Sequence, residues 1–341
     1  MFARLTYVAC RACVVLLTLS CCLLAQAEEH AAFSYAGDNT GPSAWPGTCS
    51  IGEKQSPINI ALAEHFAQIT QETNNGQKQK IGDMKIHFEQ KQDGIGDLGF
   101  DFQHELNDAE NFKFDIEQNV EDFGNIKFHF ELKFQQKPNR FGDISFQYNN
   151  QVGAVVKNTG HGTMQVNAPK GNMSQISGRD LELVQWHFHT PSEHAFDGAR
   201  KAMEAHLVHK DTKTGGLAVV AVLLDIGPAP PNPALQFALS LAPEASHEQQ
   251  TADQQPMQLE SLLPQQKPDG HRPYIHYVGS LTTPPCSEDV QWFVFGDTVT
   301  IPYSQVVQFQ EYAGKANPGL RANARPLQPI NNRTVDYADF L

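Results

Sequence analysis

The stretch QWHFHTPSEH, Gln185–His194, places three histidines within ten residues, and only Phe188 separates His187 from His189. In an extended strand, residues two apart point to the same face and lie about 7 Å apart, so these two imidazoles would converge on one point. Phe188 would then face the opposite way, toward a hydrophobic core. The pattern indicates either a metal site built on a strand or a strand that carries hydrogen-bonded histidines.

A third metal ligand would have to come from another strand. The segment MEAHLVH, at 203–209, offers His206 and His209. Zinc accepts three neutral imidazoles and keeps a fourth position for water, which is the open arrangement of a catalytic site. A ligating imidazole also needs a partner on its second ring nitrogen. Gln185 and Glu204 each precede a candidate histidine by two residues, on the same strand face, and could supply that support.

The segments beyond residue 150 are mostly strand-like, and helices are few. Apolar or alternating runs predict strands at 154–157, 164–167, 181–190, 201–209, 217–225 and 290–295. One helix is predicted at Pro233–Leu241, with Asn232 as its cap and Pro233 at its first position, and another at Ser304–Tyr312. The fold class is therefore predominantly β, or β-rich α+β, with peripheral helices.

A tandem repeat occupies residues 81–150. Units of 14 residues begin at 81, 95, 109 and 123, and the related FGDISFQYNN begins at 141. Each unit alternates apolar and polar residues and carries Gly-Asp or Gly-Asn at a turn, except that the third begins Ala-Glu. We predict a meander of strands with Met84, Phe100, Phe114 and Phe128 on one face. The edge of the main sheet or a second protomer in a homodimer would cover this face.

The first 27 residues are typical of an export signal. Arg4 and Arg11 precede the apolar run Val14–Leu24, which is too short to span a bilayer, and residues 25–27 have the small-x-small form of a cleavage site. An uncleaved membrane anchor is the alternative. We expect an exported protein, periplasmic or secreted, without a stable membrane anchor.

Cysteine usage and net charge limit the function classes. Four of the six cysteines fall within the signal, which leaves Cys49 and Cys286 as one disulfide of an oxidising compartment or as two buried thiols. The formal net charge of −13 argues against nucleic acid and anionic membranes as partners.

Five motifs together carry a family resemblance. With GSLTTPPCSEDVQW (279–292), NTGH (158–161) and QSPINI (55–60) beside the two histidine segments, the chain resembles an α-class carbonic anhydrase. The resemblance covers 33–60 and 144 to the C-terminus. It implies a large central twisted, mostly antiparallel sheet, in a single domain at 28–341 that the repeats interrupt at about 71–140.

The resemblance also implies roles for individual residues. Zn²⁺ would be held by His187, His189 and His206, with Gln185 and Glu204 supporting the ligands. Thr282 would orient the attacking water by donating its own proton to Glu193, and His161 would carry the released proton to buffer. The resemblance also implies a disulfide between Cys49 and Cys286, which is the pairing seen in exported relatives.

Further positions match the family's pattern around the site. Thr283 matches the polar rim of the family's active site. The apolar wall of that site is matched by Val208, Val219, Leu281, Val290 and Trp292. Tyr35, Asn158 and Tyr277 match polar groups that hold ordered water or orient Thr282 in the family. Asn323 and Arg325 match structural positions near the site. His194 and His209 match structural histidines that lie behind the metal ligands. The polar residue that follows the shuttle could be Met164 or Gln165.

The implied activity is reversible hydration of carbon dioxide to bicarbonate and a proton, with inhibitory anions and sulfonamides as further ligands. The alternative is a carbonic-anhydrase-like surface or mineral protein whose acidic repeats bind calcium or carbonate. A binding protein that has lost its metal ligands is disfavoured, because all three histidines are present together with Glu193 and Thr282.

Overall fold

The computed structural model describes residues 33–37, 39–63, 83–85, 111–120, 124–135, 144–149, 151–268, 270–316 and 320–338. For 83–85, 111–120 and 124–135 only the backbone pairing is considered below. The predicted export signal and the second repeat unit lie outside the described residues.

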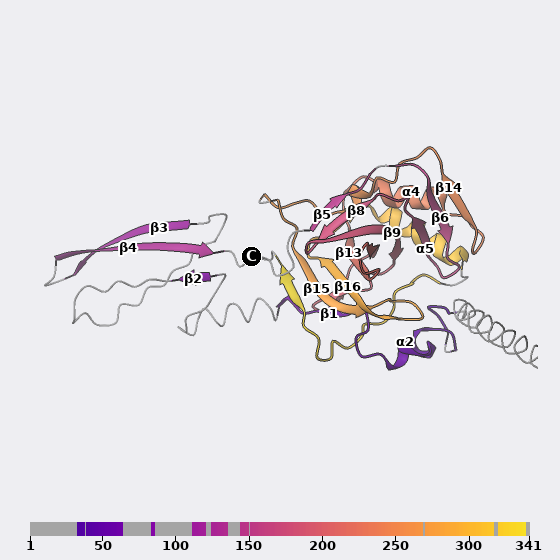
Figure 1. Cartoon of the computed structure of the whole chain (residues 1–341), viewed down its shortest axis with the longest axis horizontal. Coiled ribbons are helices and arrows are strands. Elements are labelled where there is room, and N and C mark those ends of the chain that lie inside the picture. Colours follow the sequence, from indigo (N-terminus) through magenta and orange to yellow (C-terminus); the bar gives the residue numbers. More distant parts are fainter. Residues whose placement is uncertain are drawn as a thin grey trace, which may run out of the picture.

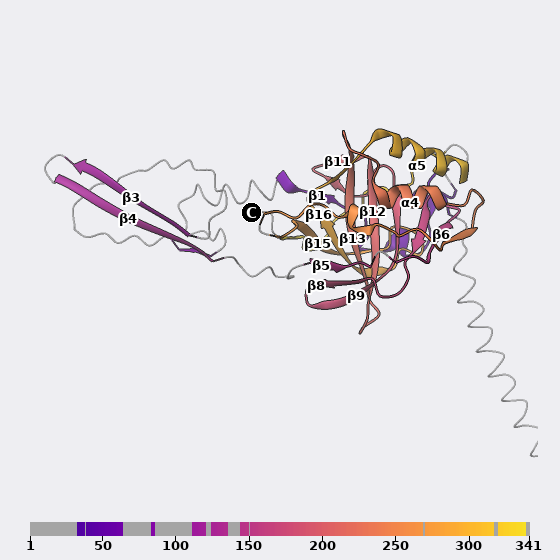
Figure 2. The same cartoon turned by 90° about the horizontal axis from the view of Figure 1, so that it is seen from above.

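A large mixed sheet of 12 strands dominates the structure, as predicted (Figures 1 and 2). Most neighbouring strands run antiparallel, and within this sheet the parallel pairs are β13–β16 and β13–β17. The central order is β14 (Gln249–Ala252), β6 (Ala154–Asn158), β7 (Met164–Asn167), β9 (Arg179–His189), β12 (Met203–Asp211), β13 (Leu217–Ile226), β16 (Glu288–Phe295), β15 (Tyr274–Ser280) and β18 (Asp336–Ala338). Off this path, β5 (Ile144–Gln147) pairs with β8 (Met173–Ile176), β8 with β9, and β17 (Val299–Ile301) with β13.

The two longer helices follow the predicted segments. Helix α4 spans Pro233–Leu241, and the Asn232 side chain caps it by accepting a hydrogen bond from Leu235 N at 3.1 Å. Helix α5 spans Tyr303–Ala316 and continues beyond the predicted end at Tyr312. Ala313 is fully buried, so packing extends the helix past the point where its apolar pattern weakens.

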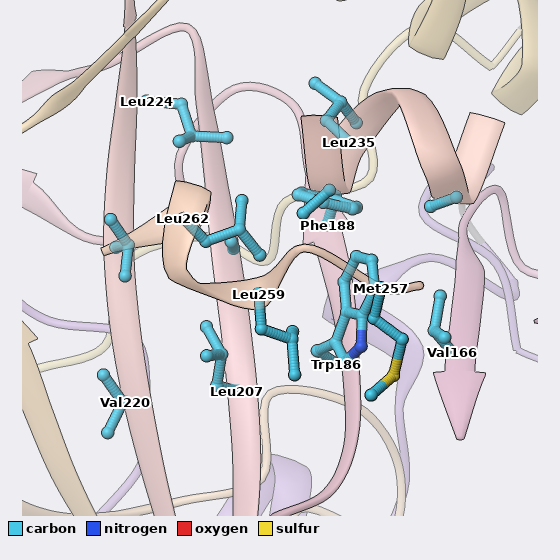
Figure 3. Close-up of a cluster of buried hydrophobic side chains, with 14 of the residues drawn as sticks. Val166, Trp186, Phe188, Leu207, Val220, Leu224, Leu235, Met257, Leu259 and Leu262 are labelled. Carbon is cyan, nitrogen blue, oxygen red and sulfur yellow. The ribbon is translucent and has the colours of Figure 1, made fainter. Parts of the chain in front are cut away.

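Alternate side chains along the strands point to opposite faces of the sheet and form two separate buried clusters. Trp186 and Phe188 join the larger cluster, which α4 and the 3₁₀ helix η3 (Leu259–Leu262) cover (Figure 3). On the other face, Val219 and Trp292 belong to a smaller cluster together with Ile58 of the N-terminal arm. Phe188 therefore faces the core, as predicted, while its two histidine neighbours face the smaller cluster.

The N-terminal arm is tied to the rest of the chain by a disulfide. Cys49, in the short helix α2 (Thr48–Ile51), is bonded to Cys286, so the predicted bridge is present. Ser56 N donates to Ser280 Oγ at 2.9 Å, and Ser280 N donates back to Ser56 Oγ at 3.1 Å. The arm also contains the 3₁₀ helix η2 (Pro42–Ala44) and β1 (Asn59–Ile60), which pairs with β10 (Ala195–Phe196); β10 in turn pairs with β11 (Ala199–Arg200). These contacts fix the arm against the loop that carries Thr282.

Three of the described repeat strands form a sheet of their own (Figure 1). Strands β3 (Asn111–Val120) and β4 (Gly124–Gln135) are antiparallel neighbours, as a meander requires. However, β2 (Asp83–Lys85) of the first unit pairs with β4, so the order β2-β4-β3 is not the sequential one of a meander. Among the described strands of the repeats, only β5, from the fifth unit, extends the main sheet.

The register of β3 and β4 matches the predicted faces. Phe114 lies opposite Phe130, so apolar positions oppose apolar positions. On the other face, Lys113 lies opposite Glu131 and Glu117 opposite Lys127.

His209 helps to hold the edge strands β5 and β8 to the sheet. Its Nδ1 donates to Leu207 O at 2.8 Å, which leaves Nε2 to accept from the hydroxyls of Tyr148 at 2.8 Å and Ser174 at 3.0 Å. Burial lowers the pKa of His209 to about 4, although the Leu207 carbonyl opposes this shift. The ring is therefore held neutral, in the structural role predicted for it.

We expect His209 to make the fold acid-sensitive. Its pKa is lower in the folded state than the value of about 6.5 in an unfolded chain, so the unfolded state binds more protons as the pH falls. This contribution to stability is complete above pH 6.5 and is lost as the pH approaches 4. Between pH 7.5 and 5 the loss is roughly 2 kcal/mol. Urea unfolding should show a weaker pH dependence for His209→Gln than for the wild type, and equal dependence would contradict the assignment.

Candidate metal centre

The pairing of β9 with β12 brings the three predicted ligands together. His206 lies directly opposite His187, and His189 follows two residues later on the same strand face. The ring centroids lie 5.1 Å apart for His187 and His189, 5.2 Å for His187 and His206, and 4.6 Å for His189 and His206. Each offers a ring nitrogen within 4.8 Å of the others.

Each imidazole is held by a hydrogen bond from the ring nitrogen that points away from the group. His187 Nδ1 donates to Gln185 Oε1 at 2.8 Å, as predicted. His206 Nε2 donates to Glu204 Oε1 at 2.7 Å, also as predicted. His189 Nδ1 donates to the backbone oxygen of Asn323 at 2.8 Å. These bonds fix the tautomers and leave His187 Nε2, His189 Nε2 and His206 Nδ1 as the free acceptors.

The free nitrogens fit a divalent metal ion. His189 Nε2 is buried and has no hydrogen-bond partner among the described residues. An orphaned buried polar atom is costly unless a ligand satisfies it. Burial, and then the neighbouring histidines, hold the pKa of His187 well below its usual value, so the ring is neutral as metal binding requires. Three neutral imidazoles without cysteine are the donor set of an open zinc site.

A second group of candidate donors, His194, Glu204 and His206, is already joined internally. Glu204 Oε1 accepts from both His206 Nε2 and His194 Nδ1, each at 2.7 Å. Burial alone would raise the pKa of the Glu204 carboxyl, but the two histidines hold it well below its usual range. Tyr277 OH donates to His194 Nε2 at 2.6 Å, so His194 supports the site from behind.

Glu193 lies beside the three histidines and is fully buried. Its Oε1 accepts a hydrogen bond from Arg325 N at 2.8 Å and lies 3.5 Å from His189 Nδ1. Its Oε2 lies 3.9 Å from His206 Nδ1 and has no hydrogen-bond partner among the described residues. Thr282, in the loop between β15 and β16, is also buried. The carboxylate therefore has an acceptor free for a hydroxyl donor.

Apolar side chains adjoin the histidines on the same face of the sheet. Trp292 packs against the His206 ring with centroids 4.9 Å apart, and its Nε1 donates to Ser280 O at 3.0 Å. Val208, Val219 and Val290 are buried in the same cluster, and Leu281 packs against it. Thr283 is half-buried in the loop after Leu281. These apolar side chains therefore lie together beside the histidines, and their role as a substrate wall stays a prediction.

His161 lies in the turn between β6 and β7, and the arm packs against it. Its ring stacks on Phe33 with centroids 3.8 Å apart, and its Nδ1 donates to Phe33 O at 3.0 Å. Burial lowers the pKa of His161, while the Phe33 carbonyl opposes the shift. Asn158, predicted near the site, supports this turn by accepting from Gly160 N at 2.9 Å.

Gln165 is the polar residue on the site's face. It lies opposite His187 in the β7–β9 pairing and is half-buried, whereas Met164 is fully buried in the core. Of the two candidates, Gln165 therefore lies on the face of the strand that carries His187. Tyr35 is buried, and burial and then the charge of Glu193 raise its pKa well above its usual value, while the charge of Arg325 opposes the shift.

Comparison with known proteins decides the family. The model of the eukaryotic-type carbonic anhydrase family matches residues 125–339, which is more than half of the chain. The chain belongs to the eukaryotic-type, or α, carbonic anhydrase family. A carbonic anhydrase from Pectobacterium atrosepticum is 36% identical over 193 residues, which are 56% of this chain and 71% of that protein.

Solved carbonic anhydrases share the fold. One from Chlamydomonas reinhardtii, in complex with acetazolamide, is 37% identical with a TM-score of 0.63, and the match covers 90% of this chain and 99% of that one. Another, from Thermovibrio ammonificans with the inhibitor sulfanilamide, is 27% identical with a TM-score of 0.59 and the same coverage. None of the helices in the described parts of this carbonic anhydrase is long and apolar enough to cross a membrane.

Replacing any one of the three histidines should remove most of the bound metal. Two imidazoles hold a divalent ion poorly, so His189→Ala should lose zinc on dialysis. Gln185→Ala should keep all three donors but weaken zinc binding by about 10- to 100-fold, because His187 loses its orienting partner. Elemental analysis and competition with a chelator measure both effects.

The matched control is His247→Asn, which removes an exposed histidine outside the group and should retain full zinc. A His189→Ala protein with stoichiometric, tightly held zinc would contradict the assignment of this centre.

Proposed function

We propose that this carbonic anhydrase hydrates carbon dioxide reversibly through a zinc ion held by His187, His189 and His206. The observation that carries the proposal is the convergence of three free ring nitrogens, each fixed by a hydrogen bond on the opposite side of its ring. Bound zinc would lower the pKa of water at its fourth position, for which carbonic anhydrases are the standard example.

Glu193 and Thr282 set the direction of attack in this proposal. Glu193 Oε2 is the free acceptor, so the Thr282 hydroxyl donates its proton there and keeps a lone pair for the attacking oxygen. Arg325 N holds the other carboxylate oxygen, which prevents the carboxyl from rotating. This orientation places a lone pair of the attacking water toward the substrate.

The apolar wall supplies the place for carbon dioxide. The side-chain carbons of Val208, Val219, Leu281 and Trp292 form no hydrogen bonds, so a linear uncharged molecule displaces water there more easily than bicarbonate does. The Thr282 and Thr283 region provides polar contacts for the product and for inhibitory anions. Acetazolamide and sulfanilamide are ligands of the two solved relatives, and we extend sulfonamide binding to this chain by proposal.

Export belongs to the same proposal. The Cys49–Cys286 bridge supports an oxidising compartment, the periplasm or the exterior, after removal of residues 1–27. We prefer this function to the mineral-binding alternative, because calcium needs converging oxygen ligands and in the described strands β3 and β4 acidic positions lie opposite Lys113, Lys127 and His129.

Stopped-flow hydration of carbon dioxide by the mature, zinc-loaded protein tests the function. His161→Ala should retain zinc and kcat/KM while kcat falls in weak buffer by about 10-fold or more, because proton transfer to solvent becomes limiting. Imidazole-like buffers should restore the rate. Absence of hydration in the zinc-loaded wild type would refute the function, and absence of buffer rescue would refute the role of His161.

The repeats should be dispensable for chemistry. Excising residues 81–136 removes four whole units and preserves the strand phase into β5, so hydration should stay largely intact. Solubility or oligomeric state should change, because an apolar strand face is lost. Light scattering measures the state, and a folded, zinc-loaded deletion without hydration activity would show that the repeats belong to the site.

A further inference from the structure

His247, which no motif singled out, packs against the turn that carries His161. Its ring centroid lies 6.2 Å from that of His161, with the planes at 77°. Its backbone is tied to the same turn, because His247 N donates to Asn158 O at 2.9 Å and Asn158 N donates to Glu248 O at 2.9 Å. The two rings are therefore held together by strand-like pairing between segments 90 residues apart in sequence.

Gly160 makes room for the His247 ring. A Cβ at position 160 would lie 2.8 Å from both Cε1 and Nε2 of His247, which is closer than real contacts allow. Gly160 also has a φ of +78°, a conformation that glycine adopts without strain. His247 itself has a φ of 66°, so its backbone occupies the left-handed region to bring the ring over the turn.

His161 is restrained at one nitrogen. Its Nδ1 donates to Phe33 O, and the stacked Phe33 ring limits rotation of the side chain. The turn is also braced by Thr159 Oγ1, which accepts from His161 N at 3.2 Å and donates to Thr163 O at 2.8 Å. A proton that arrives at Nε2 therefore leaves most readily from Nε2, toward a neighbouring acceptor, without breaking the bond to Phe33.

The two histidines differ in their access to solvent. His161 is half-buried and His247 is exposed. Burial is the main cause that lowers the pKa of His161, and the interaction with His247 lowers it further. Protonation of both rings at once is therefore unfavourable. The acidic residues nearby in the chain are Glu248 and Glu244, and Glu244 is paired with Lys315 at 2.8 Å. His247 is thus placed to receive a proton from His161 and to meet buffer directly.

We infer that His247 is the outer relay of the proton path, accepting a proton from His161 and passing it to buffer. This rests on the proposed function, in which His161 receives the proton released by hydration. One proton moves at each step, from protonated His161 to neutral His247 and then to a buffer base, so charge and atoms balance. The ring centroids lie 6.2 Å apart, which is close enough for transfer through one bridging water.

The test uses the full-length mature, zinc-loaded protein with His247→Asn, since asparagine tolerates the left-handed backbone. In weak buffer kcat should fall roughly 3- to 10-fold while kcat/KM stays unchanged, because only kcat includes proton transfer to solvent. Imidazole should restore kcat. Glu248→Gln is the matched control on the same segment and should alter neither constant.

A readout independent of activity is the NMR titration of the His161 ring, in zinc-free and zinc-loaded protein. The pKa of His161 should rise in His247→Asn, because the interaction with His247 that lowers it is removed. An unchanged kcat in weak buffer, an unchanged His161 titration or an equal fall in kcat/KM would each overturn the relay. With an active wild type, such results leave the proposed function standing, whereas an inactive zinc-loaded wild type would overturn both.

Discussion

The candidate site depends on one constraint, that an imidazole has two nitrogens and only one can face the ion. Here the outward nitrogen is Nδ1 in His187 and His189 but Nε2 in His206, and each donates to an oxygen at 2.7–2.8 Å. The acceptors are an amide, a backbone carbonyl and a carboxylate, and they come from three segments of the chain. The convergence of the inner nitrogens is therefore a property of the assembled sheet and not of any single strand.

Charged side chains are buried around the site, and Glu204 and Arg325 each have several hydrogen-bond partners there. Glu204 accepts three hydrogen bonds, from His206, from His194 Nδ1 and from His194 N. The Arg325 guanidinium donates to Gln55 Oε1 and to the backbone oxygens of Ser56 and Cys49. Removing a hydrogen-bond partner of a buried charged group costs more than the about 1–3 kcal/mol that is typical of a buried neutral group. The arm and the C-terminal segment around Arg325 must therefore be in place before the site is complete, which gives the Cys49–Cys286 bridge a role close to the chemistry.

The local periodicity of the sequence predicted which residues share a face of one strand. It could not predict contacts between segments that are distant in the sequence. The period of two placed Gln185 with His187 and Glu204 with His206, and the cap and proline gave the start of α4 correctly. The acceptor for His189 is the backbone oxygen of Asn323, and that for His161 is the backbone oxygen of Phe33. A backbone carbonyl has no side-chain signature, so no sequence pattern could report either contact. The pairing of β2 with β4 was missed for a related reason, since equivalent repeats present equivalent edges and their order depends on the folded arrangement.

The point at which the repeats enter the sheet explains how an insertion can coexist with the site. Among the described strands, β5, from the last unit, pairs with β8 alone, and β8 pairs with residues 179–182 at the start of β9. The histidines lie at the other end of β9, where residues 185–187 pair with β7. At about 3.3 Å per residue, Arg179 and His187 are separated by roughly 25 Å along the strand. A long strand thus keeps the edge that accepts additional chain distant from the three imidazoles, and the His209 cluster that anchors β5 and β8 lies on the opposite face of β12 from His206.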